Sequence, residues 1–306
     1  MIDIQKYEKI LITGADGMLG RAFVQQLEKY VPSSRLYAYN RKELDVTDLA
    51  KIIAVSEYFF GEYTLIIHCA GLVSVELCEE NKELAYDTIV NGTKNIIHLA
   101  KLTKSKIIYP QSFLIYDGIE NPIVGSTEPN PQTYYASLKL IAEKEVVNHS
   151  SENLIVRMAG FFGGENKDKN FVGKIIPNIF KALSDGDMVF EVGDRVWQPT
   201  YTSDLALNTI LLCAKNKSGV YLMSSIGEAS FWDVACEISK NLGWTDLIDI
   251  KRISSDNFSL NEPGKRPLKA IFKNDRLDFE KINIQRGWKE SLKEYLSSPY
   301  FDPFRK

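Results

Sequence analysis

The sequence predicts a doubly wound α/β fold: a parallel sheet covered by helices, with a smaller, mostly C-terminal α/β domain. Short apolar runs alternate with segments of helical periodicity through the first half of the 306 residues. This alternation stops after Arg157, where a less regular region richer in Gly and Pro begins. Ligands of such sheets bind beyond the carboxyl ends of the strands, so a site is expected there.

Each element follows from its own pattern. Five apolar runs are expected as buried strands: Ile10–Thr13, Arg35–Tyr39, Leu65–His68, Lys106–Tyr109 and Leu154–Val156. The helices expected between them are Leu19–Lys29, Leu49–Tyr58, Lys82–Lys101 and Tyr134–Asn148. The second region is expected to hold helices Phe171–Ser184, Ser203–Lys215, Phe231–Leu242 and Lys289–Ser297, and an irregular tail from Ser297 to Phe301.

A glycine-spaced turn, Thr13-Gly14-Ala15-Asp16-Gly17-Met18-Leu19-Gly20, separates the first strand from the first helix. The spacing lets the backbone turn sharply and approach a pyrophosphate at the helix N-terminus. A Cβ at Gly14 would clash in the turn, one at Gly17 would hold the phosphates away, and one at Gly20 would push the helix off the sheet. The turn therefore predicts a dinucleotide site with contacts from Gly14, Gly17, Met18, Leu19 and Gly20, the alternative being an ordinary strand-to-helix turn.

The predicted domains follow from this site. Residues 1–158, with 200–222 returning to them, are expected to form an NADP-binding domain of Rossmann type. Residues 159–199 and 223–306 are expected to form the substrate-binding domain.

The end of the second predicted strand indicates which cofactor binds. Tyr39-Asn40-Arg41-Lys42 lacks the acidic residue that usually bonds the ribose 2′-hydroxyl, and its cations suit a 2′-phosphate. We therefore predict NADPH, with NADH as a second option, bound by Asn40 and Arg41; a solvated pair of surface cations is the alternative. Asp45 and Val46 are expected beside the adenine, where a carboxylate can meet the adenine amine.

Tyr135 and Lys139 lie four residues apart on a predicted helix, so both side chains project from one face. Among the 15 tyrosines only Tyr135 has a lysine at this spacing, although such a pair also occurs by accident on solvated helices. A neighbouring ammonium and a positive nicotinamide ring favour the phenolate and are expected to bring the tyrosine pKa closer to working pH. Such a tyrosine suits a proton donor to a ketone under reduction.

Ser112 follows the run Ile107-Ile108-Tyr109-Pro110 at the carboxyl end of a strand, where its hydroxyl could hold a substrate carbonyl. A turn or cap serine is the alternative. Trp197 could stack on a base or sugar, or simply pack at a domain junction. Arg157 and Arg266 could pair with substrate phosphates, or belong to structural ion pairs.

Composition narrows the function classes. A formal net charge of -3 provides no basic field for nucleic acid. No apolar run is long enough to span a bilayer, and the start of the chain lacks a leader pattern, so a cytoplasmic protein without membrane contact is expected. Four scattered cysteines without a CxxC pair, and three histidines, predict neither disulfides nor a metal site.

With these residues placed, the chain resembles the extended short-chain dehydrogenase/reductase family, and within it the dTDP-4-dehydrorhamnose reductase group. The motifs that carry the resemblance are the loop Ile12–Gly20, Leu44–Asp48, His68–Gly71, Val90–Thr93, Ser112, Tyr116–Gly118, the Tyr135/Lys139 pair, Gln198–Ala206, Lys265–Pro267 and Trp288–Leu292. They run through almost the whole chain.

The resemblance implies a reductase of the 4-keto group of a nucleotide-linked deoxysugar, in activated-sugar biosynthesis for cell-surface polysaccharide. It makes Tyr135 the proton donor, has Ser112 orient the carbonyl, and has Lys139 tune the tyrosine and bind the nicotinamide ribose. It further implies cofactor contacts from Cys69, Ala70 and Gly71, and substrate contacts from Val73, Phe113, Trp197 and Arg266. A homodimer is expected, with a dimer face or a core-packing stripe on the helix 82–101.

Some positions depart from the group. Gln111 and Phe113 flank Ser112 where the reductases usually carry a serine and an acid. After the element Gly219–Tyr221, where a histidine commonly follows in that group, this chain has Leu222-Met223-Ser224. The sugar and its nucleotide are therefore left open. Two alternatives remain: an epimerase or epimerase-reductase that holds NAD tightly, and a non-catalytic regulatory or binding subunit, as the regulatory subunit of methionine adenosyltransferase is.

Overall fold

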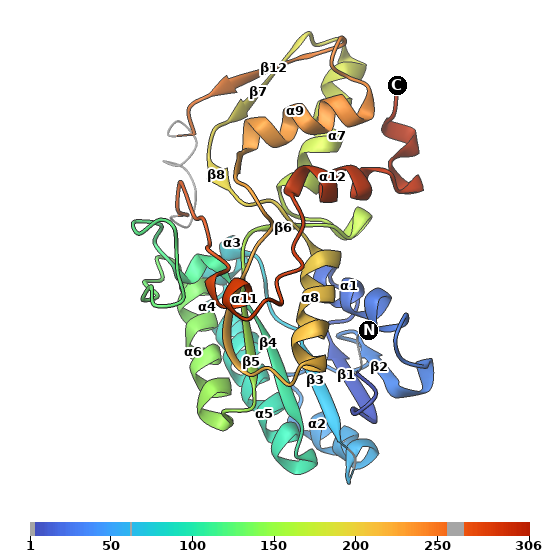
Figure 1. Ribbon diagram of the computed structural model, residues 1–306, viewed down its shortest axis with the longest axis vertical. Coiled ribbons are helices and arrows are strands. Elements are labelled where there is room, and N and C mark those ends of the chain that lie inside the picture. The colour runs from blue at the N-terminus through green and yellow to red at the C-terminus, as the bar shows by residue number, and fades with distance from the viewer. Residues whose placement is uncertain (1–3, 62, 256–265) are drawn as a thin grey trace.

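Residues 4–61, 63–255 and 266–306 are described by a computed structural model (Figure 1). The lower part in this view is a sheet covered by helices, and the upper part is a smaller group of helices and short strands. The C-terminus lies at the upper part.

A six-stranded parallel sheet forms the centre of the lower part, in the order β10-β5-β4-β3-β1-β2. The strands are β1 Lys9–Thr13, β2 Leu36–Tyr39, β3 Thr64–His68, β4 Lys106–Ser112, β5 Leu154–Met158 and β10 Gly219–Met223. All five predicted strands are confirmed. Every residue of β3 and β5 is buried because helices cover both faces of the sheet, which is why these strands read as unbroken apolar runs.

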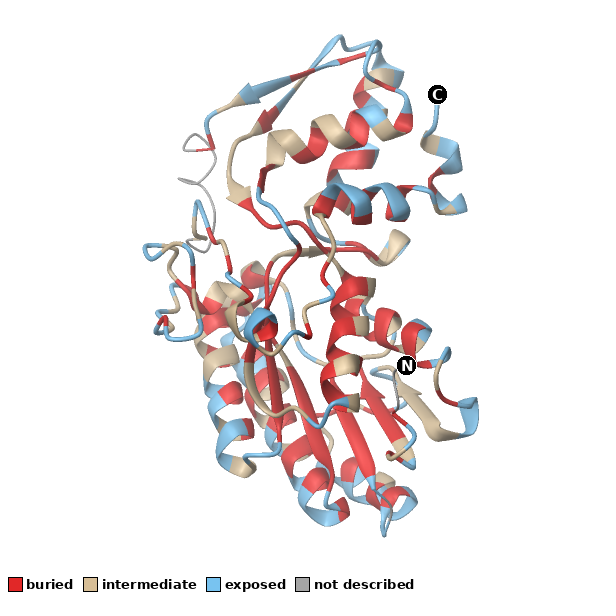
Figure 2. Cartoon of the chain, viewed as in Figure 1, coloured by how far each residue is buried: buried red, intermediate tan, exposed pale blue. Residues whose placement is uncertain are grey.

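Helices cover the two faces of the sheet. They are α1 Met18–Leu27, α2 Leu49–Ser56, α3 Val75–Glu80, α4 Lys82–Tyr86, α5 Gly92–Thr103, α6 Tyr134–His149 and α8 Thr202–Ala214. Successive side chains of β1 enter opposite cores: Ile10 and Ile12 pack with α1 and α8, whereas Leu11 packs with α2, α5 and α6. Figure 2 shows buried residues on the strands and on the helix faces turned toward them, with exposed residues outside.

The helix expected over Lys82–Lys101 is interrupted, which corrects the prediction. A π-helical segment, Asp87–Asn91, separates α4 from α5, and the periodicity of the sequence carries no signal for this wider turn. The apolar stripe of α5, including Ile96 and Ala100, packs in the core beneath the sheet. The homodimer stays a prediction.

The upper part contains α7 Phe171–Asp185, α9 Phe231–Leu242 and α12 Trp288–Leu296. Its short strands pair in twos: β7 Val189–Gly193 with β12 Asp249–Ile253, β8 Val196–Trp197 with β11 Ala229–Ser230, and β6 Phe161–Phe162 with β9 Thr200–Tyr201. The tail is not irregular as predicted. A 3-10 helix, Pro299–Phe304, buries Phe301 against Tyr295, whose ring centroid is 4.9 Å away.

Shorter elements complete the chain. Helix α11, Asp275–Phe279, lies against β10, and further 3-10 turns cover Ser33–Arg35, Glu57–Phe59, Phe113–Ile115 and Glu165–Lys167. In the part of the chain with described coordinates, no helix has the length and apolar character needed to cross a membrane.

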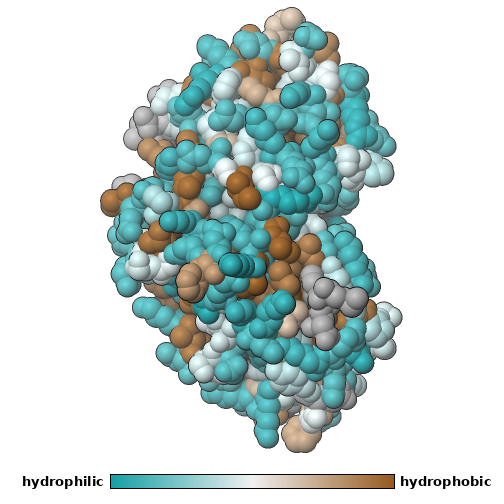
Figure 3. All heavy atoms as spheres, viewed as in Figure 1, coloured by the Kyte–Doolittle hydropathy of each residue, from teal (hydrophilic) through white to brown (hydrophobic). Residues whose placement is uncertain are grey.

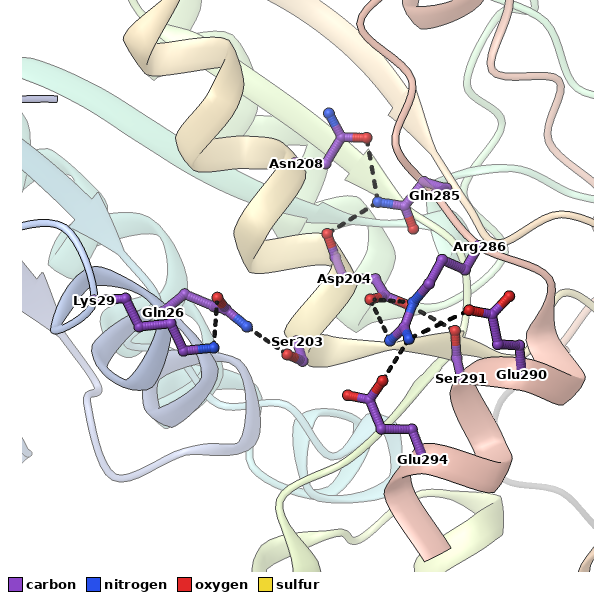
Figure 4. Close-up of polar contacts among 10 residues, drawn as sticks. All are labelled: Gln26, Lys29, Ser203, Asp204, Asn208, Gln285, Arg286, Glu290, Ser291 and Glu294. Atoms are coloured by element: carbon purple, nitrogen blue, oxygen red, sulfur yellow. Dashed lines mark hydrogen bonds and ion pairs between the residues drawn. The ribbon is translucent and has the colours of Figure 1, made fainter. Parts of the chain in front are cut away.

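A polar strap joins the two parts (Figure 4). Asp204, in the first turn of α8, accepts hydrogen bonds from the Arg286 guanidinium at 2.7 Å and from the Ser291 hydroxyl at 2.6 Å. Arg286 and Ser291 belong to the segment leading into α12 and to α12 itself. On the other side of α8, Gln26 of α1 donates to the Ser203 hydroxyl at 2.6 Å. The strap therefore ties α12 to a helix that packs directly on the sheet.

Candidate active site

The glycine turn has the tight geometry that the sequence predicts. Gly14 has a φ of +65°, and a Cβ there would lie 2.8 Å from the Ala70 backbone. A Cβ at Gly20 would lie 2.3 Å from the Gly14 carbonyl oxygen. Neither position has room for a side chain, but the clash at Gly20 is with the backbone of the turn at Gly14 and Ala15, and not with the sheet as predicted. Gly17 precedes α1 without a side-chain cap, so the first N–H groups of this helix are open to an anion.

The ends of β1 and β3 are locked together beside this turn. The Thr13 hydroxyl is 2.8 Å from His68 Nδ1 and accepts from the Ala70 N–H at 3.2 Å. Burial, followed by the charge of Lys139, lowers the pKa of His68 to about 3, so the imidazole is neutral. Cys69, Ala70 and Gly71 thus follow β3 directly at the glycine turn, between the two strands where the sheet reverses its order.

A hollow of about 420 Å³ lies between the glycine turn, α1 and the end of β2. Its lining includes Asn40, but the charged side chains in it are Asp16, Arg21 and Glu43. Arg41, expected here, is instead 70% exposed and pairs with Asp45 at 3.1 Å. Sequence reasoning missed Arg21, although its place directly after Gly20 puts it in the first turns of the helix that follows the glycines.

Asp45 and Val46 follow β2 as predicted but are held by the protein itself. Asp45 accepts from the Thr47 N–H at 3.0 Å and from its hydroxyl at 2.8 Å. Although burial raises the pKa of Asp45, the hydrogen bonds from Thr47 and Arg41 bring it below its ordinary value. Val46 is buried under Gly92, where an added Cβ would lie 2.7 Å from Val46 Cγ2. Contact of either residue with adenine stays a prediction.

Ser112, Tyr135 and Lys139 come together at the carboxyl end of β4. Thr133 caps α6 by accepting from the Ala136 N–H at 3.1 Å, which places the next two turns against the strand end. The Ser112 side chain lies close enough to Tyr135 to lower the pKa of its phenol against the effect of burial. The Lys139 ammonium donates to the Pro110 carbonyl at 2.8 Å.

Burial has the largest effect on the pKa values of Tyr135 and Lys139. Burial raises the pKa of Tyr135 to about 12, and the Ser112 hydrogen bond offsets only part of that effect. Burial lowers the pKa of Lys139 to about 7, against the opposing charge of Glu143. In the protein chain by itself, burial thus keeps the pKa of Tyr135 above its ordinary value. The expected shift toward working pH, which also involves a positive nicotinamide ring, stays a prediction. A phenol with this pKa is protonated at neutral pH, as a proton donor must be.

Gln111 is a further residue of the site that sequence reasoning did not assign. Its amide nitrogen donates to the Lys139 carbonyl at 2.9 Å and to Glu143 at 2.8 Å, while its amide oxygen accepts from the Ser112 N–H at 2.8 Å. Glu143 in turn pairs with Arg157 at 2.5 Å. Arg157 is thus a member of a buried structural ion pair, as its alternative interpretation held. No sequence signal predicts this network, because its members are distant in sequence.

The predicted substrate residues lie in different environments. Val73 is 69% exposed, whereas Trp197 is buried and its ring centroid lies 5.7 Å from that of Phe231. A Cβ on Gly160 would lie 2.6 Å from the Trp197 indole and 3.5 Å from the Phe113 ring, so these two aromatics flank Gly160. This packing favours the junction interpretation of Trp197.

Arg266 forms an ion pair with Glu76 of α3. Burial raises the pKa of Glu76, but the hydrogen bond from Arg266 outweighs it and lowers that pKa to about 2. The neighbouring Lys265, part of the same predicted motif, lies outside the described residues. Among the described residues, no group of three or more His, Cys, Asp or Glu side chains could hold a metal ion.

Comparison with known proteins places this geometry in a family. The family described as RmlD substrate binding domain matches residues 8–300. The spore coat polysaccharide biosynthesis protein SpsK of Bacillus subtilis is 24% identical over 293 residues, covering 94% of this chain and 96% of that protein. Methionine adenosyltransferase 2 subunit beta of Danio rerio is 24% identical over 305 residues, covering 95% and 90%.

Solved structures agree. A dTDP-4-dehydrorhamnose reductase of Clostridium acetobutylicum superimposes with a TM-score of 0.82 at 31% identity, covering 94% of this chain and 98% of that one. The dTDP-4-dehydrorhamnose reductase of Bacillus anthracis, in complex with NADP, gives a TM-score of 0.82 at 25% identity with the same coverage. The chain therefore belongs to the RmlD substrate binding domain family, the dTDP-4-dehydrorhamnose reductase group of the extended short-chain dehydrogenases/reductases.

Proposed function

We propose that this protein is an NADPH-dependent reductase of the 4-keto group of a nucleotide-linked deoxysugar. The observation that carries the proposal is the pair of neighbouring hydroxyls, Ser112 and Tyr135, at the carboxyl end of β4. They lie on the same edge of the sheet as the glycine turn. The two solved relatives described above are both named dTDP-4-dehydrorhamnose reductases.

The residues present fit a dinucleotide. The backbone passes so close to itself at Gly14 and Gly20 that a side chain at either position would fill the turn. The uncapped N-terminus of α1 supplies N–H groups and a partial positive charge for a pyrophosphate. Gly14, Gly17, Met18, Leu19 and Gly20 would hold the phosphates, and Cys69 to Gly71 would border the nicotinamide half.

The bound nicotinamide supplies the hydride that reduces the carbonyl carbon. Ser112 donates a hydrogen bond to the substrate carbonyl oxygen and orients it toward Tyr135. Tyr135, protonated because its pKa is raised to about 12, transfers its proton to that oxygen as negative charge develops on it. Lys139 is held by Pro110 one turn along α6, where it binds the ribose beside the tyrosine. Fixing these groups in advance can supply about 7–11 kcal/mol of the barrier reduction.

The substrate is proposed more coarsely than the reaction. A dTDP-linked 4-keto-6-deoxy sugar is the first choice, and cytoplasmic synthesis of precursors for cell-surface polysaccharide is the proposed role, supported by the name of the SpsK relative. Val73, Phe113 and Trp197 border the substrate side. Arg266 would have to leave Glu76, or share it, to contact a substrate phosphate.

The test is whether the protein consumes NADPH in the presence of a dTDP-4-keto-6-deoxy sugar. Consumption is measured as loss of the absorbance of the reduced cofactor. Tyr135→Phe is expected to lower kcat about 10²- to 10⁴-fold. NADPH affinity should stay within about threefold of the parent, because the substitution removes one hydroxyl and no charge. Tyr134→Phe is the matched control, since the Tyr134 hydroxyl makes only a 3.4 Å contact with the Lys82 carbonyl and should leave kcat unchanged.

Other outcomes separate the alternatives. Failure to consume NADPH with any nucleotide-linked 4-keto sugar contradicts the proposal. Purification with stoichiometric bound NAD, and sugar conversion without net cofactor consumption, would indicate an epimerase. Stable association with a second enzyme, whose activity does not change in Tyr135→Phe, would indicate a regulatory subunit; the Danio rerio relative is likewise named as a subunit of an enzyme.

A further inference from the structure

The hollow beside β2 contains side chains of opposite charge. Arg21 reaches it from α1, Glu43 from the segment after β2, and Asp16 from the glycine turn. Within the described residues the Arg21 guanidinium has neither an ion pair nor a hydrogen bond. Its charge is therefore not neutralised by a partner among these residues.

The position of the hollow identifies what it would contact. The Ala15 N–H donates to the Tyr39 carbonyl at 3.0 Å, which joins the glycine turn to the end of β2. In doubly wound sheets that bind a dinucleotide across the strand ends, the residue at the end of the second strand meets the adenosine ribose. Ala38 and Asn40, which line the hollow, lie at this strand end. The hollow is thus placed at the 2′ position of the ribose.

Glu43 lies at the same 2′ position but carries the opposite charge to Arg21. Its carboxylate accepts from the Asn40 N–H at 2.9 Å, which keeps it beside the strand end. The sequence has no acid at the last residue of the strand. The hydrogen bond from Asn40 nevertheless holds an acid there, the carboxylate of Glu43 three residues later. A carboxylate here can accept a hydrogen bond from a ribose 2′-hydroxyl and repels a 2′-phosphate.

We propose that Arg21 and Glu43, facing one hollow with opposite charges, set the preference of this enzyme between NADPH and NADH. Arg21 binds the 2′-phosphate and Glu43 opposes it, whereas Arg41 takes no part because Asp45 holds its guanidinium outside the hollow. Asp16 adds a second negative charge, so NADPH binding depends on Arg21. This inference rests on the proposed cofactor and names the residues of this chain that choose between its two forms.

The test is direct binding of NADPH and NADH to the purified protein, measured by calorimetry without substrate. Arg21→Gln is expected to weaken NADPH binding about 10- to 100-fold, the loss typical of a charge-assisted contact, and to change NADH binding less than about threefold. Glu43→Gln keeps an acceptor for the Asn40 N–H but removes the charge. It is expected to strengthen NADPH binding about 3- to 10-fold and to weaken NADH binding.

Arg41→Gln is the matched control and should leave both affinities within about twofold, because its side chain is exposed and already paired. The NADPH loss in Arg21→Gln should shrink as salt is added, since the phosphate contact is between charges. The inference is overturned if Arg41→Gln reproduces the loss, or if Arg21→Gln weakens NADPH and NADH equally. A parent protein that binds neither cofactor would instead contradict the proposed function itself.

Discussion

The two parts of the molecule are held together by different means. The lower part rests on a continuous parallel sheet with aliphatic side chains packed on both faces. The strands described in the upper part, outside residues 256–265, form only two-stranded pairs, and aromatic rings do much of the packing: Phe171 stacks on Phe231 with ring centroids 4.2 Å apart. Figure 3 shows a narrower waist where the two parts meet, with hydrophobic side chains exposed near it.

Because of this difference, the two parts hold their residues of the proposed site in different ways. The groups proposed to contact the cofactor project from strand ends and from the turns that follow them, where ladder hydrogen bonds leave little freedom of movement. The groups proposed for the substrate side project from short segments whose position depends on side-chain packing and on the Asp204 strap. The lower part should therefore tolerate changes in the upper part. Whether the upper part tolerates changes in the lower part should depend on the strap.

Breaking the strap is expected to have the largest effect on stability. Asp204 is 10% exposed in its side chain and accepts from both Arg286 and Ser291, so Asp204→Ala should lower the free energy of unfolding by about 2–4 kcal/mol. Glu290→Ala removes an exposed carboxylate 3.7 Å from the same guanidinium and should cost less than about 0.5 kcal/mol. Urea unfolding measures both, and a larger loss in the control would contradict the importance assigned to the strap.

Loosening the lower part at one buried amide should affect catalysis instead. Gln111→Met keeps the volume of the side chain but removes its three hydrogen bonds, and we expect kcat to fall about tenfold with little change in KM for NADPH. Gln285→Met is the control, because Gln285 is a similarly buried glutamine that bonds to α8 at the strap (Figure 4). Equal losses of stability but unchanged kcat in both variants would reduce Gln111 to a structural role.

The smallest expected effect is a pH dependence carried by the lower part. His68 has its pKa lowered to about 3 in the folded chain, against an ordinary 6.5, so the unfolded chain takes up a proton first as pH falls. The stability from neutral His68 is complete above that ordinary value and is lost toward pH 3, at no more than ~1.4 kcal/mol per pH unit. In His68→Asn the free energy of unfolding should change less steeply with pH between about pH 7 and about pH 5. Parallel slopes would contradict this assignment.

Much of the lower part could be predicted because its physics is local. Buried parallel strands read as apolar runs, and the glycine turn announces both the strand end and the helix start. The spacing of Tyr135 and Lys139 predicted that they share one helix face, and the family resemblance grouped them with Ser112; the structure places all three at the carboxyl end of β4.

The rest depends on contacts between distant segments. Two-residue strands such as Val196–Trp197 are too short to show a period, and their partners are set by packing. Arg41 and Arg21 are both cations near the cofactor motifs, and only the fold shows that one is paired and the other faces the hollow. The raised pKa of Tyr135 likewise follows from how deeply α6 buries it, which helical spacing does not report.

The π-helical segment Asp87–Asn91 also fixes the phase between its two neighbouring helices. Each residue of an α-helix turns the chain by about 100°, so removing one residue from this segment would rotate α4 relative to α5 by about that angle. Ala85 would then leave the core, while Thr93 kept its 3.2 Å contact with His68. A single-residue deletion here should cost more stability than one in the exposed loop around Ile119. The stability of this helix pair therefore depends on the number of residues in the segment as well as on their hydrophobicity.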